Sequence, residues 1–277
     1  MPGPRLLVCL AVCALLPVSL VAQQSTSSTN PATSDPQAVA VIQKSLAALT
    51  NGVSVSDVTL TGTVRRVAGS EDETGTATVT ALAVGDSKLS LNFPSGPRSE
   101  LRNPASTSPS GVAAGAWSGP DGTLHAMAAQ NLFTDATWFF PAFTAANLIS
   151  VSQGYVLTYG GLVTHDGQND LRVSAAEPFP SLAGGPAQPL MQHLTRMDLY
   201  FDPSSFLPVA LAFDMHPDND ASTDIPAEIL FSDYQTVSGA TIPMRVQQFL
   251  NNGLDLDFQF SSAVLNSGLS ASDFTIE

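Results

Sequence analysis

The chain has 277 residues, of which 44% are hydrophobic and 12% charged, and its formal net charge is −14. Ten basic residues against 24 acidic ones argue against a nucleic-acid partner, because such binding needs clustered cations that neutralise phosphates. The same charge disfavours an anionic membrane surface, and the length suits one large all-β or α+β domain or two small ones.

The N-terminus predicts a secretory signal peptide over residues 1–22. Arg5 is followed by an uncharged apolar run from Leu6 to Ala22 and then by polar residues, which is the three-part pattern of an export signal. An uncleaved anchor helix is the alternative, although Pro17 interrupts the run. We expect cleavage after Ala22 and therefore an exported, periplasmic protein.

Both cysteines, Cys9 and Cys13, lie inside this segment. The mature chain is then expected to have no disulfide, no thiolate nucleophile and no cysteine metal ligand. Each cysteine follows a valine, whereas a lipoprotein acylation signal resembles a small residue followed by cysteine. We therefore expect a soluble rather than a lipid-anchored protein.

Residues 23–34 are polar and small, which predicts a flexible linker ahead of a single domain over residues 35–277. Residues 34–52 carry the clearest helix pattern in the chain. Asp35 can cap the helix, Pro36 suits its first turn, and Asn51-Gly52 provides a stop. Its apolar residues recur at spacings of three and four, at Val39, Ile42, Leu46 and Leu49.

Strand patterns dominate from residue 55 onward. We predict an antiparallel meander of strands and hairpins that runs to the C-terminus. In the last strand apolar residues alternate strictly with polar ones, so that one face is apolar. The predicted strands of the first half cover residues 55–67, 74–84 and 87–93. Predicted loops cover 103–111 and 177–189, and turns fall at 119–122, 165–167, 202–205, 238–239 and 251–253.

Residues 124–150 interrupt the strand pattern, because apolar residues there are too dense and alternate too poorly for a strand. We predict one or two short helices, with a break or kink at Pro141. Large aromatic residues crowd together in this segment. They either fill the core or cap an apolar cavity that admits a ligand, and the candidate ligand-lining residues are Trp138, Phe139, Phe140 and Phe143.

Catalytic and cofactor motifs are absent from the sequence. It has no GxSxG, HExxH, GxxxxGK[ST], GxGxxG or SxxK pattern, and we predict no catalytic, cofactor-binding or metal-binding residue. The four histidines are not spaced as paired metal ligands on one helix, which favours solvated or hydrogen-bonded side chains. They are His125, His165, His193 and His216.

The loop over residues 216–224 concentrates Asp218, Asp220 and Asp224. Oxygen-rich loops of this kind bind calcium in many proteins. This one lacks the glycine and the distant glutamate of an EF-hand loop, and clustered Asp, Asn and Ser are common in turns. The pattern therefore favours a plain solvated loop over a calcium site.

The C-terminal third carries short motifs in a characteristic order. They are Tyr234, Val237, Gly239 and Pro243, then Asn252-Gly253, then Leu269, Ser270 and Phe274, preceded by residues 199–203 and 207–209. With the signal peptide, the N-terminal helix and the helical interruption, this order resembles the periplasmic lipoprotein carrier superfamily, the LolA/LolB-like proteins. The likeness is tightest over residues 197–276 and is one of architecture before them.

The resemblance implies a mainly β (α+β) fold, an open antiparallel half-barrel with an N-terminal helix and a short helical plug. It also implies a non-enzymatic protein that holds an apolar ligand, such as a lipid or lipoprotein acyl chains, without a cofactor. An envelope sensor or scaffold domain that binds another protein is the first alternative. A hydrolase is the second, and it lacks a nameable nucleophile and base.

Overall fold

The computed structural model describes residues 33–108, 110–150 and 154–276. The predicted signal peptide (1–22) and most of the predicted linker (23–34) lie outside the described residues. The boundaries of the predicted domain therefore stay a prediction.

The described residues are mainly β, as predicted. The strands are β1 (Asp57–Ala68), β2 (Glu71–Leu82), β3 (Ser87–Phe93), β4 (Gly96–Asn103), β5 (Ala114–Ser118), β6 (Leu124–Ala126), β7 (Val156–His165), β8 (Gln168–Ala176), β9 (Met197–Phe201), β10 (Pro208–Met215), β11 (Ile225–Val237), β12 (Ala240–Leu250) and β13 (Gly253–Leu265). The helices are α1 (Pro36–Thr50), α2 (Pro141–Ile149) and α3 (Ala187–Leu194), with short 3-10 turns η1 (Ala129–Leu132), η2 (Pro180–Leu182) and η3 (Ala271–Phe274). None of the described helices is long and apolar enough to cross a lipid bilayer.

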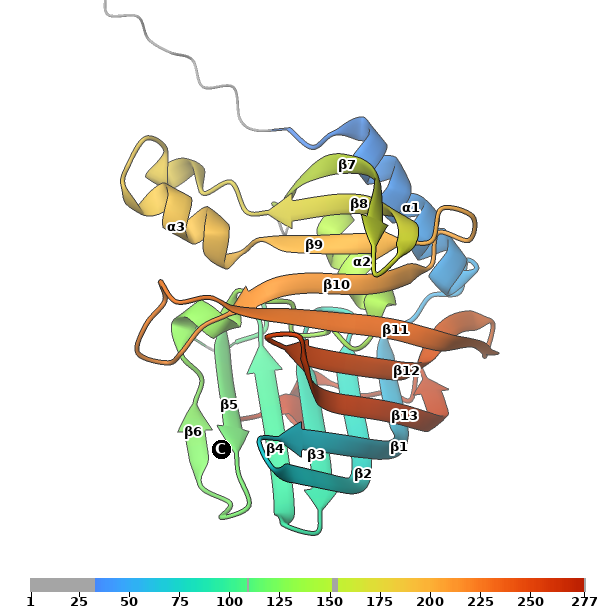
Figure 1. Cartoon of the computed structure of the whole chain (residues 1–277), viewed down its shortest axis with the longest axis vertical. Coiled ribbons are helices and arrows are strands. Elements are labelled where there is room, and N and C mark those ends of the chain that lie inside the picture. The colour runs from blue at the N-terminus through green and yellow to red at the C-terminus, as the bar shows by residue number, and fades with distance from the viewer. Residues whose placement is uncertain (1–32, 109, 151–153, 277) are drawn as a thin grey trace, which may run out of the picture. The chain divides into compact units, whose positions relative to one another are not determined.

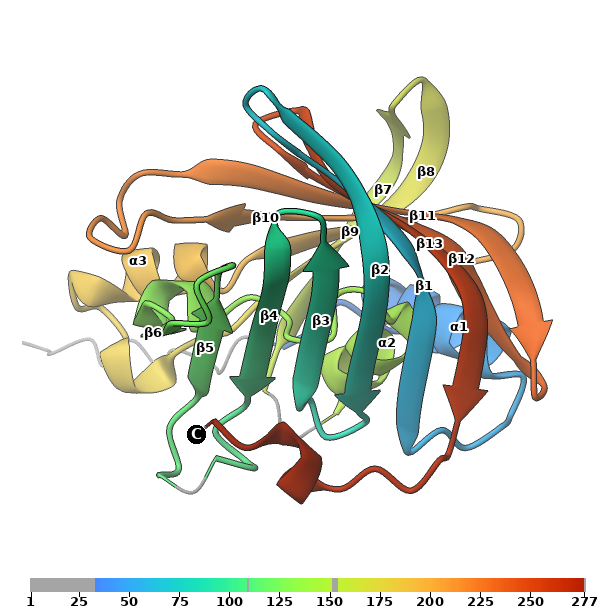
Figure 2. The ribbon, with the colours of Figure 1, turned by 90° about the horizontal axis from the view of Figure 1, so that it is seen from below.

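The thirteen strands form one antiparallel sheet in the order β6-β5-β4-β3-β2-β1-β13-β12-β11-β10-β9-β8-β7. Two meanders, β1 to β6 and β7 to β13, meet where β1 pairs with β13. The strands of the two meanders run in different directions, so the sheet is curved, and α1 and α2 lie on one side of it (Figures 1 and 2). The sheet does not close, which confirms the predicted open half-barrel.

Two glycines lie where the backbone of a neighbouring strand leaves no room for a side chain. A Cβ atom at Gly62 would be 2.1 Å from the carbonyl oxygen of Gln259, and one at Gly75 would be 2.0 Å from that of Asn92. The β1–β13 register also shifts between Thr61 and Gly62. A side chain is excluded at both positions, and such glycines and bulges are how strands bend sharply within a sheet.

Helix α1 forms as the sequence predicts. The side chain of Asp35 accepts a 2.8 Å hydrogen bond from the backbone N–H of Gln37, and Asn51 adopts the left-handed conformation at the C-terminal end. The carboxylate thus satisfies one of the free N–H groups at the helix start. Its buried side includes Ile42 and Leu49, which pack into the core.

The core lies between the helices and the sheet. On β13, Leu256, Phe258 and Phe260 are buried, as the alternating pattern predicts. The rings of Phe258 and Trp138 lie 6.1 Å apart between centroids, so the helical insertion packs directly on the apolar face of this strand. One apolar cluster joins residues of α1, α2 and both meanders.

Four local expectations differ from the structure. The segment predicted to interrupt the strands starts after residue 126 rather than at 124, because residues 124–126 pair with β5 as the edge strand β6. Pro141 begins α2 rather than breaking a helix, because proline suits a first turn where no backbone N–H donor is required. Strand β4 was not predicted, since its residues GPRSELRN show no apolar alternation. Helix α3 begins within the Pro- and Gly-rich segment 177–189, which the sequence suggests is a loop.

Candidate ligand cavity

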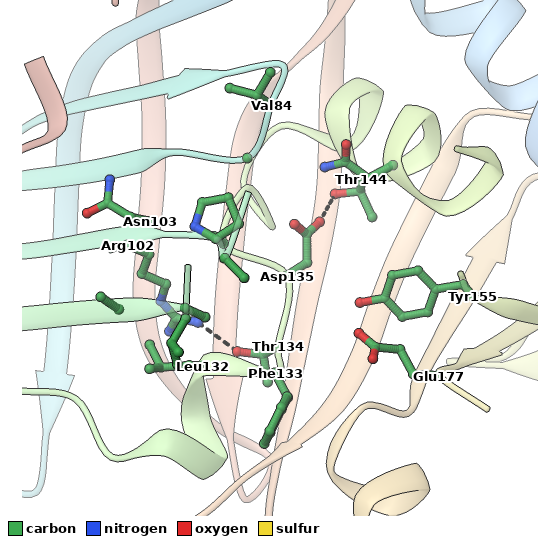
Figure 3. A pocket seen from close by; sticks show the side chains of 18 of the residues that line it. Val84, Arg102, Asn103, Leu132, Phe133, Thr134, Asp135, Thr144, Tyr155 and Glu177 are labelled. Atoms are coloured by element: carbon green, nitrogen blue, oxygen red, sulfur yellow. Dashed lines mark hydrogen bonds between the residues drawn. The ribbon is translucent and has the colours of Figure 1, made fainter. Parts of the chain in front are cut away.

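A cavity of about 420 Å³ opens between the ends of β4 and β5, the segment 129–136 and α2 (Figure 3). Its far side is formed by Tyr155 ahead of β7 and by Glu177 after β8. The volume lies within the range of small-molecule binding pockets. The lining residues are Val84, Gly85, Arg102, Asn103, Pro104, Ala105, Gly111, Val112, Ala113, Ala114, Ala129, Leu132, Phe133, Thr134, Asp135, Ala136, Thr144, Asn147, Leu148, Tyr155, Glu177 and Met197.

Most of the cavity wall is apolar and made of small side chains. Leu132, Phe133, Leu148 and Met197 are the larger apolar groups. Val84 and Val112 also line the cavity, yet they are 51% and 66% exposed. The cavity therefore meets solvent beside two exposed valines.

Arg102 of β4 fixes the segment 129–136 against the sheet. Its Nε donates to Glu100 over 2.7 Å, and its Nη1 donates to the carbonyl of Asn131 over 3.1 Å and to the hydroxyl of Thr134 over 2.7 Å. Arg102 is 5% exposed, so these bonds compensate a charge that would be costly to bury alone. One cavity wall thus depends on Arg102 and its buried hydrogen bonds, called the polar node below, rather than on apolar packing.

Different faces of helix α2 contact the core and the cavity. Thr144, Asn147 and Leu148 line the cavity, and their spacing of three and four places them on one side of a helix. Phe143 points elsewhere and packs against Phe140 in the core, with ring centroids 4.7 Å apart.

The start of α2 is held by Asp135. The Thr144 hydroxyl donates to one carboxylate oxygen of Asp135, and the backbone N–H and hydroxyl of Thr137 donate to the other, each over 3.0 Å. Three donors therefore satisfy this carboxylate at the edge of the cavity, and they tie the 129–136 segment to α2.

The far end of the cavity is polar and acidic. The carboxylate of Glu177 and the hydroxyl of Tyr155 point toward the same space (Figure 3), and the hydrogen bonds found among the described residues do not include either group. Burial raises the pKa of Glu177. Burial also raises the pKa of Tyr155, with smaller contributions from the charges of Glu177 and Asp135. Within the described part of the chain, this end of the cavity therefore carries a carboxylate and a hydroxyl without hydrogen-bond partners.

The four aromatic residues proposed to line a ligand site lie in the core. Trp138, Phe139, Phe140 and Phe143 are at most 4% exposed, and the residues that line the cavity are others. Their contact with a ligand stays a prediction. Because they precede and begin α2, they fix the helix whose other face borders the cavity.

The lining residues escaped sequence analysis because they come from many separate segments with no shared spacing. The Pro- and Ser-rich segment 103–111 and the small residues 112–114 suggest only a loop. Glu177, alone among apolar and proline residues in AAEPFP, was the one local signal, since an isolated carboxyl in such surroundings is often functional.

No protein-family model matches the chain. No curated protein matches it in sequence.

Solved structures share its fold. A domain from Vibrio parahaemolyticus, named for outer membrane lipoprotein sorting, is 12% identical with a TM-score of 0.55, over 86% of this chain and 96% of the other. A LolA superfamily protein from Nitrosomonas europaea is 11% identical with a TM-score of 0.51, over 86% and 97%. A DUF1329 family protein from Desulfovibrio piger is 10% identical with a TM-score of 0.51, also over 86% and 97%. At these identities the likeness establishes a LolA-like fold and nothing finer.

Proposed function

We propose that the protein is a non-enzymatic binding protein that shelters an apolar chain, such as a lipid or lipoprotein acyl group, in this cavity. The observation that carries the proposal is a largely apolar cavity of about 420 Å³ with exposed valines at its rim. Burying about six methylenes at about 0.8 kcal/mol each would contribute about 5 kcal/mol, near a submillimolar dissociation constant before entropic costs.

The acidic end of the cavity restricts the head group of the ligand. Glu177 and Asp135 would repel a free carboxylate, whereas the oxygens of Glu177 and Tyr155 would accept or exchange hydrogen bonds with a hydroxyl or amide. We therefore expect a ligand with a neutral, hydrogen-bonding head rather than a free fatty acid.

The cavity offers little to an enzyme. Among its described lining residues there is no serine, cysteine or histidine, so a Ser–His or Cys–His pair cannot be assembled from them. The oxygens of Asp135 are occupied by Thr137 and Thr144. These observations support binding over turnover.

Export to the periplasm is part of the proposal. The predicted signal peptide supports it, and a mature protein that begins at Gln23, measured by intact mass, would agree with cleavage after Ala22. An envelope protein partner is the alternative to a lipid; binding to a partner that persists after delipidation, with no uptake of apolar probes, would favour it.

Uptake of the neutral fluorescent probe N-phenyl-1-naphthylamine tests the proposal. We expect saturable binding, competition by dodecanol that is stronger than competition by laurate, and at least tenfold weaker binding in Ala136→Trp, which fills the cavity. Leu162→Trp adds the same ring at an edge-strand position that is 59% exposed and should bind normally. Absence of uptake by the wild type, or equal binding by both variants, would overturn the proposal.

A further inference from the structure

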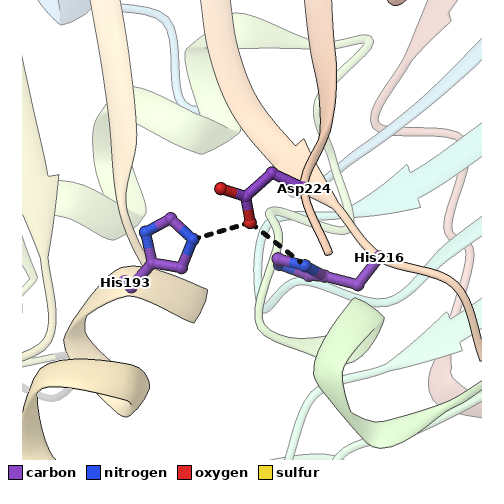
Figure 4. Close-up of side chains that lie close together, drawn as sticks. All are labelled: His193, His216 and Asp224. Carbon is purple, nitrogen blue, oxygen red and sulfur yellow. Dashed lines mark hydrogen bonds and ion pairs between the residues drawn. The ribbon is translucent and has the colours of Figure 1, made fainter. Parts of the chain in front are cut away.

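A second group of functional side chains lies outside the cavity and is assembled by the fold. His193 is in the last turn of α3, His216 follows β10, and Asp224 precedes β11 (Figure 4). One nitrogen of each imidazole and one oxygen of Asp224 all lie within 4.8 Å of one another. His193 Nε2 is 2.8 Å and His216 Nδ1 is 3.6 Å from Asp224 Oδ1.

Local hydrogen bonds hold His216 in place. Asn131 accepts from the backbone N–H of His216 over 2.9 Å and donates to its carbonyl over 2.8 Å. The loop that follows is organised by Asp220, which accepts from the backbone and hydroxyl of Ser222 and from the hydroxyl of Thr223. Asp220 is thereby occupied, and Asp224 is the loop carboxylate that faces the histidines.

The burial of the three side chains is uneven. The side chain of His216 is fully buried, and its Nε2 has no hydrogen-bond partner among the described residues. Its Nδ1 lies 3.1 Å from the carbonyl oxygen of Thr223. The side chains of His193 and Asp224 are 39% and 42% exposed, so the group is open to solvent on one side.

We propose that His193, His216 and Asp224 form a binding site for a divalent transition-metal ion such as Zn²⁺, with water completing its coordination. Imidazole nitrogen and carboxylate oxygen are the ligand types these ions prefer. Bonds of 2.0–2.2 Å in a tetrahedral site place ligand atoms about 3.3 Å apart, and the two separations from Asp224 Oδ1, 2.8 and 3.6 Å, bracket that value.

A purely hydrogen-bonded group is the alternative to a metal site. A proton on His193 Nε2 would explain its 2.8 Å contact with Asp224. His216 Nδ1 can donate to the Thr223 carbonyl, 3.1 Å away, or bind an ion at its measured separation from Asp224, but not both, because each role uses the same atom. As a ligand, His216 would carry its ring proton on Nε2.

A second group provides a contrast. His165 lies near Asp166 and Glu228, but it is the sole imidazole there and both of its nitrogens face carboxylates, Glu228 at 2.7 Å and Asp170 at 3.5 Å. Its ring stacks on Tyr200 at 3.9 Å. These contacts give both ring nitrogens of His165 a carboxylate partner within the protein, and this group serves as the comparison site below.

Metal binding to the full chain, purified without a histidine tag and treated with a chelator, tests the proposal. We expect one Zn²⁺ per chain by isothermal titration calorimetry, and bound Co²⁺ should give the visible absorption of a low-coordinate nitrogen and oxygen site. His193→Ala and Asp224→Ala should each weaken Zn²⁺ binding at least tenfold. Both side chains are partly exposed, so these variants should still fold.

Three substitutions are matched controls and should leave affinity within twofold of the wild type. Asp218→Ala changes the same loop without touching the site, His125→Ala removes an exposed histidine stacked on Trp117, and His165→Gln disrupts the comparison site. Wild-type protein that binds no Zn²⁺ at micromolar concentrations would overturn the proposal. So would loss of binding in His165→Gln with binding retained in His193→Ala.

Discussion

The two faces of α2 border two different kinds of interior. On one face Phe143 packs with Phe140 and the neighbouring aromatic residues into a filled core. On the other, Thr144, Asn147 and Leu148 border an open cavity of about 420 Å³. A helix of nine residues therefore lies between a packed core and an open cavity.

The difference lies in what supports each side. The core is held by large apolar side chains in mutual contact, a non-directional interaction that closes any gap it can. The segment 129–136 of the cavity wall is held in place by directional hydrogen bonds, which Arg102 donates and Asp135 accepts. The cavity cannot collapse without breaking these hydrogen bonds, and we therefore expect them to keep it open.

The largest expected effect comes from truncating one aromatic residue on each side. Phe139→Ala, at a position with no exposure, should lower the free energy of unfolding by about 3–5 kcal/mol, because it leaves a void in a packed core. Phe133→Ala removes the same ring from the cavity wall and should cost less than about 1 kcal/mol while weakening uptake of the naphthylamine probe. Urea unfolding curves and probe titrations of both variants make the comparison.

Equal losses of stability in the two phenylalanine variants would contradict this distinction between a packed core and an open cavity. That result would mean that the Phe133 side of α2 is packed like the Phe139 side, and that the cavity is not maintained in solution.

A smaller effect is expected from removing the polar node. Arg102→Ala leaves the carbonyl of Asn131 and the hydroxyl of Thr134 without their donor and should cost about 2–3 kcal/mol, the range for buried hydrogen bonds to a charged group. Probe binding should fall as well, since the 129–136 wall loses its support. Both are measured by urea unfolding and probe titration.

Arg65→Ala is the matched control for the node. It breaks the Arg65–Asp72 pair, whose side chains are 48% and 53% exposed, and exposed pairs contribute little. A loss of stability in Arg65→Ala as large as in Arg102→Ala would show that charge, rather than the buried node, stabilises this half of the sheet.

Local patterns in the sequence were sufficient for much of the fold. The turn at Asn251-Asn252 follows from two residues that tolerate positive φ, 48° and 62° here, and the alternation on β13 fixed which side faces the core. Strand β4 was missed because Arg102, its most buried residue, is charged. Its burial depends on Asn131 and Thr134, which lie far away in sequence.

Neither the cavity nor the proposed metal site could be predicted from local sequence patterns, and the reason is the same for both. His193 and Asp224 are 31 residues apart, and a search for metal ligands spaced along one helix cannot detect them. The cavity joins residues from Val84 to Met197, so its existence depends on the curvature of the sheet. Single-sequence reasoning predicts which residues are apolar, but not where the fold leaves space between them.

The smallest expected effect concerns the carboxyl at the polar end of the cavity. Burial raises the pKa of Glu177 above its ordinary value of 4.5, so the folded state retains the proton more strongly than the unfolded state. Folding is therefore opposed by ionisation as the pH rises from 4.5 toward neutrality. Glu177→Gln should raise the free energy of unfolding at pH 7 by about 0.5 kcal/mol, and this gain should disappear below pH 4.5.

Asp57 supplies a comparison, because its pKa is shifted in the direction opposite to that of Glu177. Burial alone would raise its pKa, but hydrogen bonds from Ser267, Gly268 and Ser56 outweigh that effect and hold it below 3.8. Its contribution is present above pH 3.8 and is lost as the pH falls through its folded-state value, so the deficit of Asp57→Asn should shrink in acid. Urea unfolding from pH 3 to 8 distinguishes the two variants, because the free energies of unfolding of Glu177→Gln and Asp57→Asn should change with pH in different ways relative to the wild type. A Glu177→Gln profile parallel to that of the wild type would mean that this carboxyl is solvated, and that the cavity's far end does not select a neutral head group.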